Sequence, residues 1–110
     1  MDPSLMYQAV AAGEVDVISA FSTDGRVAAF DLLVLEDDRG AIPPYDAVIL
    51  AGPRLVRERP DVVAALEQLA ATIDAGRMRR MNLAVDQDGE SPAAVAGALL
   101  REVREERRGR

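Results

Sequence analysis

The spacing of apolar residues along the chain alternates between the period of helices and the period of strands. The first segment places its apolar positions on one helical face, with Pro3 in the first turn and Gly13 after the last, so the pattern predicts a helix over residues 3–13. Residues 15–20 follow this break as an alternating and then β-branched run, which predicts a buried strand.

Two further strands are predicted downstream. Residues 31–35 are continuously apolar after Asp31, which is typical of a strand that is covered on both faces. Residues 46–51 form the third apolar run, and a Gly-Pro pair stops it. Between these runs, two adjacent prolines keep residues 41–45 extended, so Tyr45 is held on a stiff segment.

The helical period returns after Pro60. Apolar spacings of three and four predict an amphipathic helix that ends near Gly76, and a second helix covers residues 78–83 or a little beyond. Ser91 caps a last helix, with Pro92 at its first position. The residues expected to face inward on this last helix are Val95, Leu99, Leu100 and Val103. The sequence therefore predicts an α/β half up to residue 52 and a helical half after it.

The turn at residues 22–25 permits two interpretations. It follows the first predicted strand, and ligands of open α/β sheets collect beyond the ends of strands. Its Ser, Thr and Asp side chains also suit the N-cap of a short helix that runs to Phe30. The residue pattern alone leaves both open.

Charge and composition exclude several classes of function. The net charge is -6 and the 13 basic residues, all of them Arg, are scattered among 19 acids, so we expect no nucleic-acid partner. Only the last ten residues are locally basic, and we interpret them as a solvated helix end. The absence of Cys and His removes disulfides, thiolate nucleophiles, zinc-thiolate sites and the usual acid/base, so we expect no metal and no cofactor.

The carboxylates of the turns raise an enzymatic alternative. Asp24, Asp37 or Asp38 could in principle form acid/base pairs, as the two carboxylates of glycosidases do. They lie in ordinary turns without a nucleophile or cofactor loop, and the acidic run at residues 36–38 lacks the alternating ligand positions of a calcium loop. We therefore predict that the chain is not an enzyme.

Six short motifs occur in order along residues 3–100. They are LMYQAV at 5–10, GEVDV at 13–17, STDGRV at 22–27, DLLVLEDD at 31–38, PPY at 43–45, and MNL at 81–83 followed by VD. Together they resemble the glycine betaine/choline/carnitine class of substrate-binding proteins of ABC importers, in their C-terminal half. The resemblance implies part of a periplasmic-binding-protein type II (Venus-flytrap) fold. By the family's layout, residues 1–42 complete the second lobe, residues 43–52 form a crossover strand, and the helices of residues 53–110 belong to the first lobe.

The resemblance also implies a ligand site. Family members hold a quaternary ammonium solute (betaine, choline or carnitine) in an aromatic cage, because a trimethylammonium group has no N–H to donate and is attracted to ring faces by about 0.5–2 kcal/mol each. The matching cage positions are Phe21 and Tyr45; Phe21 replaces the family's usual tyrosine and lacks its hydroxyl. Thr23 and Asp24 either line the cleft or brace the turn.

Each aromatic residue has a structural alternative. Phe21 would fill the core and Tyr45 would pack under the prolines. Tyr7, on the first predicted helix, and Phe30, before the second predicted strand, are expected in the core.

The resemblance sets the expected partners and location. It implies an ABC permease and an extracytoplasmic parent protein, in the periplasm or on the outer face of the cytoplasmic membrane, although residues 1–4 show no signal-peptide pattern and no run reaches membrane-spanning length. Family receptors are more than twice as long, so uncovered strands and helix faces favour self-association by domain swapping or sheet extension. The alternative function is a non-catalytic interaction or oligomerisation domain that retains the receptor fold without binding solute.

Overall fold

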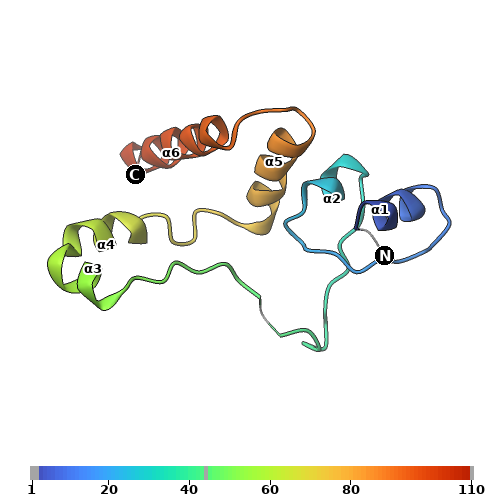
Figure 1. The fold of residues 1–110 in the computed structure, drawn as a ribbon, viewed down its shortest axis with the longest axis horizontal. Helices are drawn as coiled ribbons and strands as arrows, with labels where there is room; N and C mark the ends of the chain where they lie inside the picture. The colour runs from blue at the N-terminus through green and yellow to red at the C-terminus, as the bar shows by residue number, and fades with distance from the viewer. Residues whose placement is uncertain (1–2, 44, 110) are drawn as a thin grey trace. The chain divides into compact units, whose positions relative to one another are not determined.

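Six helices form within residues 3–43 and 45–109, the parts of the chain that the computed structural model describes (Figure 1). The chain divides into two units, Met1–Val34 with Asp74–Arg110, and Leu35–Ile73. The first unit contains α1 (Pro3–Ala11), α2 (Gly25–Ala29), α5 (Ala75–Asp86) and α6 (Pro92–Arg108), and the second contains α3 (Pro53–Glu58) and α4 (Pro60–Glu67). No helix of the described residues combines the length and apolarity needed to cross a membrane.

The end of α1 is set by Gly13, as predicted. Gly13 has φ 71°, and its N–H donates to the carbonyl of Val10 at 3.1 Å, while the N–H of Glu14 donates to the carbonyl of Ala9 at 2.9 Å. This pair of bonds satisfies carbonyl groups that the end of a helix leaves without partners, and it needs a left-handed residue at the position of Gly13. The predicted helix is confirmed.

The helix α2 confirms the N-cap interpretation of the turn. The Asp24 side chain accepts a hydrogen bond from the backbone N–H of Arg26 at 2.9 Å. The C-terminal end repeats the geometry of α1, because the N–H of Leu32 donates to the carbonyl of Val27 at 2.9 Å. Here the left-handed position is held by Asp31, with φ 50°, in place of a glycine.

The strand predictions for residues 15–20, 31–35 and 46–51 were wrong for this structure. Within the described ranges no residue is assigned to a strand, and none of these segments is hydrogen-bonded to another through its backbone. A strand needs a neighbour that donates to and accepts from its backbone, which an apolar pattern alone does not provide. The apolar side chains stay exposed, with Leu33 at 85% and Leu50 at 89%. The described residues therefore do not show the α/β half.

The two C-terminal helices match their local signals. The side chain of Ser91 accepts from the N–H of Ala94 at 3.2 Å, and Pro92 begins α6, as predicted. The α5 prediction is also confirmed, although α5 begins earlier, after the Asp74 cap. The prediction that Leu100 faces inward was wrong, because a stripe with a spacing of four residues is buried and Leu100 lies one position off it, 42% exposed. That stripe consists of Val95, Leu99 and Val103.

The amphipathic helix predicted to extend to Gly76 ends at Glu67. Residues 68–72 continue as turns, in which the Thr72 hydroxyl donates to the carbonyl of Leu69 at 2.8 Å and Ala71 has φ 58°. Local bonding by a threonine side chain competes with helical bonding of this kind. The short helix α3 was not predicted, although Pro53 at its first position is a recognisable start signal.

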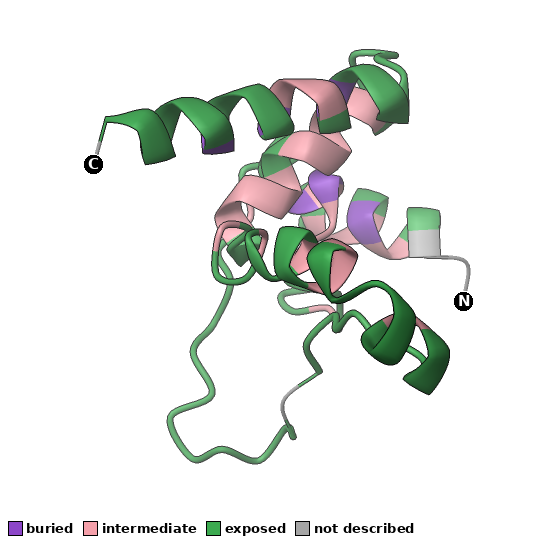
Figure 2. Cartoon of the chain, turned by 90° about the vertical axis from the view of Figure 1, so that its left-hand side faces the viewer, coloured by how far each residue is buried: buried purple, intermediate pink, exposed green. Residues whose placement is uncertain are grey.

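The core of the first unit is small (Figure 2). Among the described residues, its buried apolar side chains come from α1, α2 and α6; they are Tyr7, Val27, Val95, Leu99 and Val103. The expectation that Tyr7 belongs to the core is confirmed, whereas Phe30 is 40% exposed, because it lies at the open end of α2. Because α2 packs against α5 in this unit, segments assigned by sequence to different lobes lie together, and the lobe assignment itself stays a prediction.

Candidate functional site

The candidate site is built on the turn at residues 21–25, at the entrance to α2. The N–H of Asp24 donates to the carbonyl of Phe21 at 3.0 Å and closes the turn. Phe21 is 69% exposed and therefore does not fill the core. Its ring stands at the start of a turn that is closed by hydrogen bonds.

An ion pair stiffens the turn. The Arg26 guanidinium donates to both carboxylate oxygens of Asp24, at 3.0 Å through Nε and 2.7 Å through Nη2. Only 15% of the Asp24 side chain is exposed, so water screens the pair weakly. The hydrogen bonds from Arg26 outweigh burial and lower the pKa of Asp24 to about 2.

The same guanidinium contacts α1. Its central carbon lies 4.2 Å from the centroid of the Tyr7 ring, which is a cation–π distance, and the Phe30 ring stacks on Tyr7 at 6.2 Å between centroids. The buried Tyr7 hydroxyl makes no hydrogen bond of ordinary geometry with described residues. Burial, followed by the neighbouring Asp24 carboxylate, raises the pKa of Tyr7.

A second helix holds the turn from the other side. Asn82 on α5 donates a hydrogen bond from Nδ2 to the backbone carbonyl of Thr23 at 2.7 Å. Gly25 approaches the α5 backbone so closely that a Cβ at this position would lie 2.7 Å from the Leu83 nitrogen. Asn82 belongs to the MNL motif at residues 81–83, but no role was predicted for its side chain.

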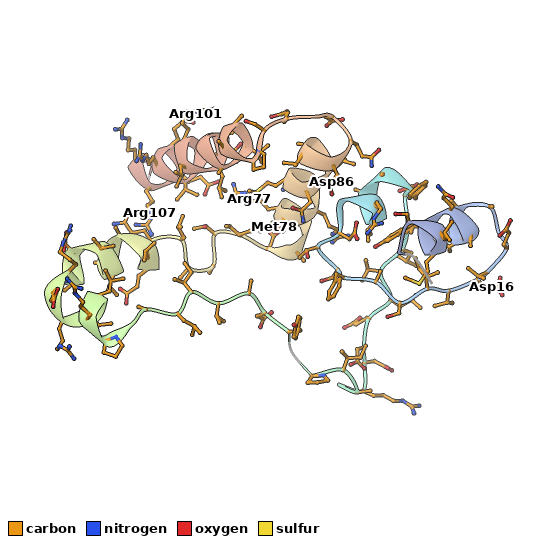
Figure 3. The ribbon with its side chains drawn as sticks, viewed as in Figure 1. Asp16, Arg77, Met78, Asp86, Arg101 and Arg107 are labelled. Atoms are coloured by element: carbon orange, nitrogen blue, oxygen red, sulfur yellow. The ribbon has the colours of Figure 1, made fainter. Side chains whose placement is uncertain are left out.

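The helix α5 is in turn fixed to α6 (Figure 3). Arg77 on α5 extends toward α6, where its guanidinium lies 3.2 Å from a carboxylate oxygen of Glu102 and 3.0 Å from one of Glu106. The two glutamates lie one helical turn apart, so both face the same cation. The supports of the turn thus come from α1 and α5, and the Arg77 ion pairs join α5 to α6.

The four site residues predicted from sequence lie in two units. Phe21, Thr23 and Asp24 belong to the first, while Tyr45 belongs to the second and is 90% exposed. Thr23 and Asp24 are partly buried, and the bonds described above engage the carbonyl of Thr23 and the carboxylate of Asp24. Both residues therefore brace the turn in this structure.

Other candidate sites lack suitable chemistry. An open hollow of about 630 Å³ lies between α1 and residues 14–19, but its lining contains no aromatic ring. The Asp37 carboxylate accepts from the backbone N–H groups of Ala41 and Ile42, at 3.0 and 2.7 Å, and these bonds lower the pKa of Asp37. Among the described residues, no cluster of three His, Cys, Asp or Glu side chains suits a metal ion.

The chain resembles known proteins over most of its length. The OpuAC family, described as the substrate binding domain of the ABC-type glycine betaine transport system, matches residues 1–102. The chain is 32% identical to the carnitine transport binding protein OpuCC of Listeria monocytogenes over 100 residues, which are 91% of this chain and 32% of that protein.

Two other relatives are named for different solutes, one for ergothioneine and one for glycine betaine. The ergothioneine transport permease/ergothioneine binding protein EgtU of Helicobacter pylori is 31% identical over 100 residues, 91% of this chain and 18% of that protein. A glycine-betaine-binding protein of Pseudomonas aeruginosa is 30% identical over 102 residues, 93% of this chain and 33% of that protein. The chain thus spans a third or less of the length of these relatives.

Proposed function

The chain belongs to the OpuAC family, the substrate-binding domains of ABC-type glycine betaine transport systems, and we propose that it is the solute-binding part of an osmoprotectant importer. The family has the periplasmic-binding-protein type II fold, and its members are non-catalytic proteins that are extracellular, periplasmic or membrane-anchored. The proposed partners are a quaternary ammonium solute (betaine, choline or carnitine) and the ABC permease of the parent system. The proposed location is extracytoplasmic.

The exposure of two aromatic rings carries this proposal. Phe21 and Tyr45 occupy the positions that match the family's cage, and 69% and 90% of their surfaces are accessible. An accessible ring presents its negative face to a cation that cannot donate hydrogen bonds. Tyr7 is buried and already has a cation over its ring, so it is not available for the solute.

Thr23 and Asp24 have a supporting role in this proposal. The Asp24 carboxylate is saturated by Arg26, and the carbonyl of Thr23 is engaged by Asn82. We assign both residues to bracing the turn that carries Phe21. The resemblance implies that the cage lies between the two lobes of the parent receptor.

The exposed apolar segments favour a second candidate function. Residues 31–35 and 46–51 present aliphatic side chains to solvent and have no paired neighbour among the described residues. Such segments recruit another strand by extending a sheet. An interaction or oligomerisation domain that self-associates without binding solute would use the same surfaces.

Ligand-dependent stability separates the two functions. The melting temperature of the chain is measured with and without millimolar glycine betaine, choline and carnitine. A solute at 100 times its dissociation constant stabilises the folded state by about 2.7 kcal/mol, which shifts the melting temperature by several degrees. A rise in melting temperature with one of the solutes is expected.

Matched variants assign the shift to the rings. Phe21→Ala and Tyr45→Ala remove ring faces, whereas Phe21→Leu keeps an apolar side chain and Phe21→Tyr restores the family's hydroxyl. The solute-dependent shift should disappear in the Ala and Leu variants and persist in Phe21→Tyr. If no solute shifts the wild-type melting temperature while sedimentation shows concentration-dependent association, the interaction-domain function is favoured instead.

A further inference from the structure

We infer that Asn82 and Gly25 are positioning residues of the solute site, through which α5 sets the place of the Phe21 ring. This inference rests on the proposed role of Phe21 in binding. Both residues act on the backbone of the turn at residues 21–25.

The first contact is the hydrogen bond from Asn82 Nδ2 to the carbonyl of Thr23, at 2.7 Å. Thr23 lies two residues after Phe21, so the bond restrains the backbone from which the ring projects. Both partners are half-buried. Water competes less strongly for the groups of a hydrogen bond that is partly shielded from solvent. Removal of the Asn82 donor would leave the half-buried carbonyl of Thr23 without this partner.

The second contact is the close approach of Gly25 to α5. A Cβ at this position would lie 2.7 Å from the nitrogen and 2.9 Å from the Cα of Leu83. These are backbone atoms of a helix, and they cannot rotate away as a side chain can. The absence of a side chain at Gly25 is therefore what lets the turn rest on α5.

The two contacts enclose Asp24, the residue that closes the turn. Its N–H donates to the carbonyl of Phe21, and its carboxylate is held by Arg26. The restraint from α1 thus acts on Asp24 through Arg26, and the contacts from α5 act on its two neighbours, Thr23 and Gly25. The backbone that carries the Phe21 ring is thus restrained by contacts on both sides of the turn.

The test removes the donor without changing shape. Asn82→Asp is nearly isosteric, but an ionised carboxylate cannot donate to the carbonyl of Thr23. Asn82→Gln keeps an amide donor on a longer side chain. Arg77→Gln is the matched control, since it breaks the ion pairs between α5 and α6 and keeps the Asn82 amide and Gly25 unchanged.

Affinity for glycine betaine is measured by titration calorimetry at a temperature where circular dichroism shows each variant fully folded. We expect the dissociation constant to rise at least fivefold in Asn82→Asp, to recover partly in Asn82→Gln, and to stay within twofold of wild type in Arg77→Gln. Equal affinity losses in Asn82→Asp and Arg77→Gln, or no loss in Asn82→Asp, would overturn the inference.

A second readout keeps the inference separate from the proposed function. Amide hydrogen exchange of Asp24 reports closure of the turn without any ligand, because that N–H makes the bond to the carbonyl of Phe21. We expect exchange to be at least tenfold faster in Asn82→Asp and unchanged in Arg77→Gln. If wild type binds none of the solutes, the proposed function fails, and this exchange ratio alone decides the inference; similar exchange in both variants overturns it.

Discussion

The guanidinium of Arg26 lies 4.2 Å from the centre of the Tyr7 ring while it donates two hydrogen bonds to the Asp24 carboxylate. One side chain therefore joins α1 to the turn that begins α2. The planar, forked shape of the guanidinium allows both contacts at once, because its edge donates while its face rests on the ring.

Replacing Arg26 should lower the stability of the first unit. Arg26→Lys keeps the charge but provides a single point donor, and we expect a loss of about 1 kcal/mol. Arg26→Gln leaves a largely buried carboxylate without its cation, and we expect a loss of about 2 kcal/mol. The midpoint of urea unfolding at pH 7 measures both. Equal midpoints for wild type and Arg26→Gln would contradict the role given to the pair.

Acid should destabilise the chain through Asp24. Its pKa is about 2 in the folded chain and close to 4 in an unfolded one, so the carboxylate form favours folding. This contribution, about 2 kcal/mol, is complete above pH 4 and is lost as the pH falls from 4 to 2. Urea unfolding at pH 5.0 and pH 2.5 measures it. Asp24→Asn should be less stable at pH 5.0 and should lose less on acidification; a loss equal to that of wild type would refute the assignment.

Replacing Asp31 with glycine should stabilise the folded chain. It adopts φ 50° at the end of α2, a conformation that glycine reaches without the steric penalty of a Cβ. We expect Asp31→Gly to raise stability by up to about 1 kcal/mol, and Asp31→Val, whose branched side chain resists this conformation, to lower it by about 1–2 kcal/mol. Thermal unfolding followed by circular dichroism checks the order of the three proteins. A more stable Asp31→Val variant would contradict the observed backbone.

Two neighbouring leucines on α6 test the burial pattern. Leu99 is buried and Leu100 is 42% exposed. Leu99→Ala should cost about 2–4 kcal/mol of unfolding free energy, because it leaves a cavity in a small core, whereas Leu100→Ala should cost well under half as much. Urea unfolding of the two variants provides the comparison. Similar losses would place α6 in a different rotation about its axis.

The end of α1 and the start of α6 were predictable because their signals are local. Ser91 followed by Pro92 marks the start of α6, and Gly13 marks the end of α1, from the printed sequence alone. The strands were not predictable in this way. An apolar run such as residues 46–51 indicates a need for burial, but pairing depends on a second segment that the pattern does not identify.

The candidate site likewise contains local features that the sequence predicts and a long-range contact that it does not. Asp24 as an N-cap follows from the residues next to it. The bond between Asn82 and Thr23 joins positions 59 residues apart, and no local pattern identifies the acceptor of a side-chain amide. Leu100 shows that helical spacing gives an inward face only to within about one position, since a residue 100° around the helix from a buried one still fits a broad apolar stripe.

The first unit is discontinuous along the chain, since its two stretches are separated by residues 35–73. The contact of α2 with α5, made by Asn82 and Gly25, is non-covalent and does not need the intervening peptide. Two separate peptides, residues 1–34 and residues 74–110, should therefore reassemble when mixed and gain helicity that neither has alone. The first unit should therefore behave as a split protein, because a cut in the chain between Leu35 and Gly52 leaves both of its stretches whole.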